Sequence, residues 1–141
     1  MKQCTYAQAM ADITGDEIRG KVWFHQQDNG VLVTAQISGL PRDGFFAFHI
    51  HEGVDCGGSG FEDTGGHFNQ AGASHPEHAG DLPPLLSCKR RAFLSVLTDR
   101  FCVEDVLNRT VVIHSATDDF RSQPAGDSGE KLACGIIRRN W

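Results

Sequence analysis

The sequence has 141 residues, a formal net charge of −5 and 40% hydrophobic residues, which predicts one domain, residues 1–141, with a single core. Its negative charge, with no basic run longer than Lys89–Arg91, excludes nucleic acid as an expected partner. It contains neither an apolar run long enough to cross a membrane nor a signal-peptide pattern, so we expect no membrane partner and, for the chain as given, the cytoplasm.

Short β-strands are the main pattern along the chain. Residues 6–13 are rich in strand formers, and residues 20–37 alternate on both sides of Asp28-Asn29-Gly30, a strong hairpin signal. Further strands are expected at 45–50, 92–97, 110–114 and 132–137, with one helical turn within 98–109. This pattern predicts an all-β fold, either a sandwich or a flattened barrel. Two long connections, 52–87 and 115–131, interrupt it, and loops of such length in a compact domain are usually functional.

Histidines gather in and just before the first long connection. His49 and His51 are two apart in an expected strand, so both side chains leave the same face and can share one ion. On its own, such a pair is weak support for a metal site and favours a surface or packing role.

A second histidine cluster gives a sharper prediction. His67, His75, His78 and Asp81 offer three imidazoles and one carboxylate, a complete tetrahedral donor set for zinc. The alternative is a solvated polar loop with incidental histidines. The loop is also rich in glycine, so ordering it costs much conformational entropy, which a bound divalent ion would offset.

The order of the motifs resembles one family. "FHIHEG" followed by a cysteine, "GGHFN", "HPEHAGDLPPL", "TVVIHSATDD" and "GEKLACGII" are similar to the successive signatures of the Cu/Zn superoxide dismutases, in a bacterial style. The match covers nearly the whole chain. It implies a Greek-key β-sandwich, or flattened eight-stranded barrel, with two long functional loops.

The resemblance also implies a metal site and its ligands. It places copper and zinc as cofactors, with His67 bridging the two ions and acting in catalysis. Asp118 would hydrogen-bond His49 and His75 and so fix their orientation. The alternative for Asp118 is a surface acid. The implied copper ligands are His49, His51, His67 and His114, and the implied zinc ligands are His67, His75, His78 and Asp81.

Five cysteines are too few for a disulfide scaffold, and from composition alone one bridge or a metal role is open. The resemblance implies a disulfide between Cys56 and Cys134, worth about 4 to 5 kcal/mol in the chain-entropy model. Cys4, Cys88 and Cys102 match no family position, so we expect them to be free thiols.

Lys131 departs from the family pattern, which commonly has arginine before "LACG". The resemblance implies that this cation lies beside copper and guides the anionic substrate. Lysine keeps the charge but loses the planar, bidentate guanidinium, so we expect weaker substrate positioning and a reaction that still proceeds. Arg121, in the second long connection, is another candidate guiding cation.

The implied function is an antioxidant oxidoreductase that disproportionates superoxide to dioxygen and hydrogen peroxide. The alternative is a non-enzymatic copper- and zinc-binding module, a carrier or a store, since fold does not determine function. The resemblance suggests a homodimer, although Arg138 and Arg139 argue against an interface at the last strand, as animal relatives use. Because bacterial relatives are often exported, the periplasm or the extracellular space is an alternative compartment.

Overall fold

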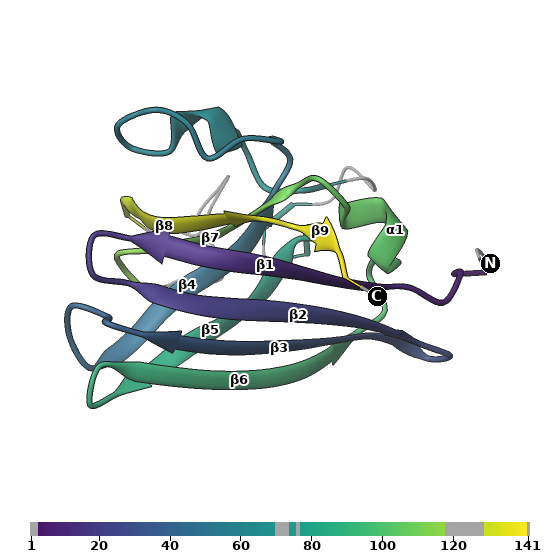
Figure 1. The fold of residues 1–141 in the computed structure, drawn as a ribbon, viewed down its shortest axis with the longest axis horizontal. Helices are drawn as coiled ribbons and strands as arrows, with labels where there is room; N and C mark the ends of the chain where they lie inside the picture. The colour runs from purple at the N-terminus through teal and green to yellow at the C-terminus, as the bar shows by residue number, and fades with distance from the viewer. Residues whose placement is uncertain (1–2, 70–73, 76, 118–128, 141) are drawn as a thin grey trace.

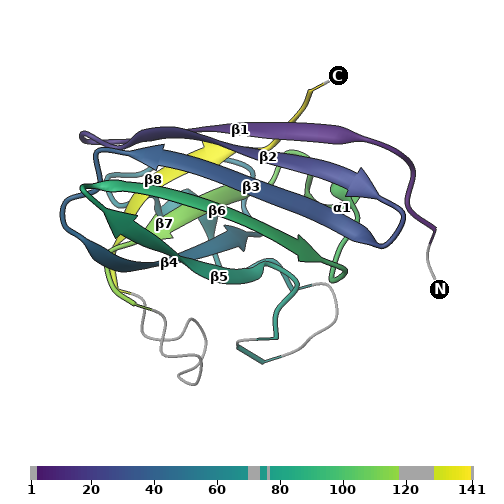
Figure 2. The same cartoon turned by 90° about the horizontal axis from the view of Figure 1, so that it is seen from below.

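The computed structural model describes residues 3–69, 74–75, 77–117 and 129–140. Its strands form two layers that cross each other, with β1, β2, β3 and β6 in one layer and β4, β5, β7 and β8 in the other (Figures 1 and 2). The strands are β1 (Gln8–Gly15), β2 (Arg19–Gln27), β3 (Gly30–Ser38), β4 (Gly44–His51), β5 (Asp81–Cys88), β6 (Arg91–Thr98), β7 (Thr110–His114), β8 (Lys131–Ile136) and β9 (Arg138–Arg139). The short helices are η1 (Glu62–Thr64) and α1 (Val103–Val106).

The strands close into an antiparallel barrel. Their order is β2-β3-β6-β5-β4-β7-β8-β1-β9, and a further pairing of β1 with β2 closes the ring of the first eight. Closure leaves no exposed sheet edge within that ring. The predicted eight-stranded Greek-key barrel is therefore confirmed, and the short β9 is an addition that pairs with β1.

Apolar side chains at every second position of the strands fill the barrel. On β1, Ala9, Ala11 and Ile13 are buried while the residues between them are exposed or half-buried. The β2–β3 hairpin follows the expected register, with Gln27 opposite Gly30 across Asp28-Asn29. The predicted helical turn is α1, which follows β6 and contacts β2.

The first long connection is shorter than predicted. Residues 81–87, predicted as loop, belong to strand β5, although Pro83 and Pro84 lie within it. Proline lacks the N–H that a ladder needs, so the local sequence argues against a strand there. The strand forms nevertheless, because Leu82 and Leu85 are buried in the core. The β4–β5 register shifts between Phe46 and Phe48, opposite the prolines.

Two disulfides fasten segments that are distant in sequence. Cys56, in the first long connection, is bonded to Cys134 on β8, with 5.9 Å between their Cα atoms. Cys4 is bonded to Cys102, the residue preceding α1, with 5.6 Å between the Cα atoms. The prediction that Cys4 and Cys102 are free thiols is therefore wrong, whereas Cys88 is free and exposed.

Within the part of the chain that the structure describes, no helix is long and apolar enough to span a membrane.

Candidate metal centre

Strand β4 carries the centre on one of its faces. Phe48 and Ile50 point into the barrel core, whereas His49 and His51 leave the opposite face, where the first long connection covers them. That cover is made by backbone contacts: the Ile50 N–H donates to Gly80 O at 2.8 Å, and the Phe68 N–H donates to Ile50 O at 2.8 Å. Both histidines are consequently buried, which decides against a surface role for the pair.

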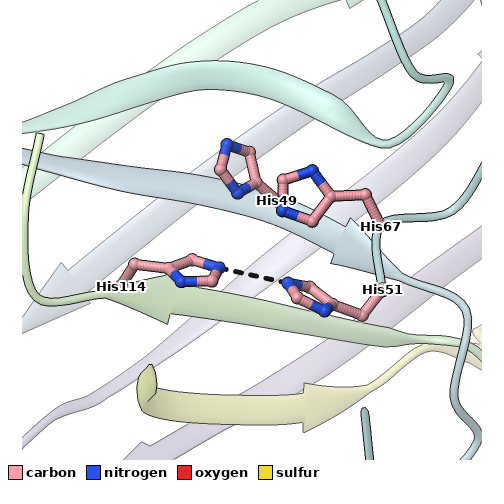
Figure 3. A group of neighbouring side chains, drawn as sticks. All are labelled: His49, His51, His67 and His114. Carbon is pink, nitrogen blue, oxygen red and sulfur yellow. Dashed lines mark hydrogen bonds between the residues drawn. The ribbon is translucent and has the colours of Figure 1, made fainter. Parts of the chain in front are cut away.

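Four histidines surround one small space (Figure 3). His114 comes from β7, which pairs with β4, and His67 forms an isolated bridge with His51. The Nε2 atoms of His51 and His114 lie 3.1 Å apart, and the rings of His49 and His67 have centroids 4.1 Å apart. One donor nitrogen from each of the four lies within 4.8 Å of the other three. This spacing suits four imidazoles around a single ion.

Burial favours the neutral form of three of these imidazoles, those of His49, His51 and His114, because it lowers their pKa. It lowers the pKa of His51 to about 2 and that of His114 to about 4, and it lowers the pKa of His49 as well. The His51 Nδ1–H donates to Gly65 O at 2.8 Å, which leaves the lone pair of Nε2 directed at the shared space. A neutral imidazole with an oriented lone pair is the form that binds a metal.

A second donor group lies on the other side of His67. The Asp81 carboxylate faces three Nδ1 atoms, those of His67 at 2.6 Å, His75 at 3.0 Å and His78 at 3.0 Å. Burial alone would raise the pKa of Asp81, but the hydrogen bond from His67 and the nearby imidazoles lower it overall. The carboxylate is therefore charged and available to a cation.

His67 takes part in both groups. Its Nδ1 faces Asp81, while its Nε2 is buried and has no hydrogen-bond partner among the described residues. Buried polar nitrogens are usually satisfied, so an atom of this kind marks the place of something that binds there. The geometry fits one ion on each side of the His67 ring.

The donor atoms within mutual reach in the second group are those of His49, His67, His75 and Asp81. His78, predicted in place of His49, contacts two of these residues: its Nδ1 lies 3.0 Å from Asp81 and 3.4 Å from the Nδ1 of His67. His49 lies between the two groups, with its ring 5.5 Å from that of His75. The three histidines of the predicted zinc set thus converge on its carboxylate, Asp81.

A family model described as copper/zinc superoxide dismutase matches residues 18–137. The chain belongs to this family. It is 36% identical over 140 residues to superoxide dismutase [Cu-Zn] 2 of Aquifex aeolicus, covering 89% of this chain and 82% of that protein. It is also 36% identical over 126 residues to the Legionella pneumophila superoxide dismutase [Cu-Zn], covering 84% and 77% respectively. A crystal structure of the clock protein EA4 superposes with a TM-score of 0.86 and 30% identity, covering 98% of each chain.

The superoxide dismutase resemblance implied that Lys131 lies beside copper. In the structure it lies beside the first long connection, the covering loop over His49 and His51. Its Nζ donates to Thr64 Oγ1 at 2.7 Å and to Gly65 O at 3.1 Å, the same carbonyl that accepts the His51 N–H. Burial lowers the pKa of Lys131, while Glu62 raises it. An ammonium has three N–H donors, so beyond these two bonds it has one more to offer an anion.

Some site residues were missed by the sequence analysis or lie outside the structure's description. Asp118 and Arg121 fall outside the described residues. Thr64 and Gly65, which hold Lys131 and orient His51, were not predicted, because hydroxyl and carbonyl contacts of this kind have no sequence signature. Glycine-rich spacing around "DTGGHF" is the one signal that could have directed attention there.

Proposed function

We propose that this chain disproportionates superoxide, with two superoxide anions and two protons yielding dioxygen and hydrogen peroxide. Copper and zinc are its cofactors. The observation that carries the proposal is the group of four buried imidazoles that shares His67 with the carboxylate group at Asp81. His49, His51, His67 and His114 would hold copper, and His67, His75, His78 and Asp81 would hold zinc. When bound, copper supplies two oxidation states, which accept an electron from one superoxide and return one to the next.

The protein residues then orient substrate and protons. Lys131 places a positive charge at the covering loop, where it attracts the anion and donates a hydrogen bond to it. His67 Nε2 is the atom that would hold the proton destined for peroxide, because it is buried and has no competing partner among the described residues. Asp81 lies beside Nδ1, the opposite nitrogen of the same ring, and zinc bound by both residues would keep this imidazole oriented.

The first test is metal content together with superoxide consumption. Protein saturated with both metals and then dialysed should retain one copper and one zinc per chain, and pulse radiolysis should show rapid superoxide decay. Zinc retained without copper would contradict the proposal. Retention of both metals without superoxide decay would instead support the non-enzymatic metal-binding module.

A homodimer is the second part of the proposal. Phe45 and Leu86 are cross-strand partners on β4 and β5 and are 46% and 49% exposed; Phe93, next to the Ser87–Ala92 pair, is 64% exposed. Exposed apolar side chains that lie together mark association surfaces. By contrast, Arg138 and Arg139 are exposed at the last strand, where charge disfavours a buried interface.

Sedimentation velocity tests this surface. The wild-type chain should sediment as a dimer, and Phe45→Ser with Leu86→Ser should shift it to a monomer. Arg138→Ala should leave the dimer intact. A monomeric wild type, or a dimer insensitive to the paired serines but disrupted at Arg138, would contradict the proposed interface.

The third part of the proposal is the compartment, for which the cysteines give support. Cys4–Cys102 and Cys56–Cys134 are both formed in the structure, and disulfides persist in oxidising compartments. This supports the periplasm or the extracellular space over the cytoplasm.

A further inference from the structure

Arg100 lies in the connection between β6 and α1 and reaches the residues that face Asp81. Its Nη1 donates to His78 O at 3.1 Å and to Asp81 O at 3.5 Å. Both acceptors are backbone carbonyls, so these two bonds do not use the carboxylate oxygens or the imidazole nitrogens that a metal requires. Arg100 can therefore hold this segment without competing for the metal.

The segment that Arg100 contacts is one tight turn. The Asp81 N–H donates to His78 O at 3.0 Å, and the His78 N–H donates to Asp81 Oδ2 at 2.9 Å, so backbone and side chain both close it. Arg100 binds the carbonyls of the first and last residues of this turn. Both of those residues belong to the proposed zinc set, so the distance between them depends on the turn.

The opposite side of the turn is held by β4. Gly80 O accepts from the Ile50 N–H at 2.8 Å, and a Cβ added at Gly80 would lie 2.3 Å from Ile50 O, closer than any side chain permits. Glycine here allows the turn to approach the strand that carries His49 and His51. The turn is thus fixed to β4 by its backbone and to the β6–α1 connection by Arg100.

The connection that carries Arg100 is itself fastened at Cys102, two residues further on. Cys102 is buried and bonded to Cys4, and its N–H donates to Asp105 Oδ2 at 2.9 Å. The next residue, Val103, donates its N–H to Gln26 Oε1 at 2.9 Å in a buried hydrogen bond to β2. The disulfide therefore restrains the backbone that determines how far Arg100 can move.

We propose that Arg100 is a positioning residue for the zinc ligands His78 and Asp81, and that the Cys4–Cys102 disulfide holds the connection from which it acts. The inference rests on the zinc half of the proposed function and not on superoxide chemistry. Residues that orient metal ligands from outside typically change metal affinity 10- to 100-fold when they are removed. Arg100 binds backbone carbonyls and is exposed, so we expect the lower end of that range.

The test measures zinc release from the fully metallated protein. Arg100→Ala should raise the rate of zinc transfer to a colorimetric chelator about tenfold, and Arg100→Lys should recover part of the loss, since an ammonium can still donate to His78 O. In protein with Co²⁺ at the zinc position, the visible absorption bands should change in Arg100→Ala and return toward wild type in Arg100→Lys. A general loss of stability would not be rescued in this way.

Arg19 provides the matched control. Its Nη1 also donates to two backbone carbonyls, Gly15 O at 2.6 Å and Ile18 O at 2.7 Å, but on the β1–β2 connection. Arg19→Ala should leave zinc release and the cobalt bands unchanged. A rate for Arg100→Ala within twofold of wild type, or an equal increase in Arg19→Ala, would overturn the role of Arg100 whether or not the protein consumes superoxide.

A double-mutant cycle tests the disulfide. The paired change of Cys4→Ser and Cys102→Ser should raise the zinc release rate by a few-fold, and adding it to Arg100→Ala should produce little further increase, because both changes act through Arg100. Serines avoid unpaired thiols and leave Cys56–Cys134 intact. Fully multiplicative effects, or no effect of the serines in an otherwise wild-type chain, would overturn the part of the proposal that concerns Cys4–Cys102.

Discussion

Asp81→Ala is expected to lower the melting temperature of the metallated protein by roughly 10 to 15 °C. The three Nδ1 atoms of His67, His75 and His78 face this carboxylate, so its removal takes away the only charged donor of that group. A thousand-fold loss of zinc affinity reduces stability by about 4 kcal/mol when zinc is in large excess. In a domain of this size each kcal/mol corresponds to roughly 3 °C or more.

Scanning calorimetry with and without a chelator separates zinc binding from packing. His49→Ala should lower the melting temperature less than Asp81→Ala, because in the proposed function zinc organises the glycine-rich connection. In the metal-free state the difference between wild type and Asp81→Ala should shrink to less than half. If the two variants lost equal stability, or if the difference persisted without metal, zinc would not be the organiser of the loop.

Lys131→Glu is expected to lower the second-order rate constant for superoxide at least about tenfold. Reversing one charge roughly 6 Å from a monovalent anion changes its energy by about 1.4 kcal/mol even at the dielectric constant of water, and that energy corresponds to a factor of ten. Superoxide dismutases are an established example of electrostatic steering. Lys131→Arg should keep or raise the rate, because it preserves the charge and restores a planar donor.

Lys21→Glu is the matched control, since it changes the net charge by the same amount. Lys21 lies on β2, and its ammonium is paired with Asp12. Its variant should change the rate little, and both variants should retain copper. The wild-type rate should also fall modestly as salt rises, because screening weakens attraction beyond about 8 Å at physiological ionic strength. An unchanged rate and salt dependence in fully metallated Lys131→Glu would exclude Lys131 as the guiding cation and direct the test to Arg121.

Local sequence patterns were sufficient to predict most of the strands. The alternation along β1, β2 and β3, and the Asp28-Asn29-Gly30 hairpin, predicted strands that the structure contains, because a half-buried strand must repeat every two residues. The order of the histidine motifs indicated the family for a related reason. A metal site limits its ligands to a few residue types at set spacings, and this pattern can be recognised in a single sequence.

Other features depend on contacts between segments that are far apart in the sequence, which local patterns do not encode. Strand β5 exists despite Pro83 and Pro84 because Leu82 and Leu85 are buried in the barrel. The Cys4–Cys102 disulfide joins residues 98 apart, and spacing alone does not reveal that the N-terminal segment passes beside α1.

By itself, then, the sequence determined the fold class, the family and the residue types of the centre. Only the tertiary structure decided which atoms face one another: His67 Nδ1 toward Asp81, Lys131 onto the carbonyl that orients His51, and Arg100 onto the turn of the proposed zinc ligands. For the last two contacts the physical reason is that hydrogen bonds to backbone carbonyls impose no requirement on the identity of the accepting residue. Such hydrogen bonds therefore cannot be predicted from the sequence and are seen only in the folded chain.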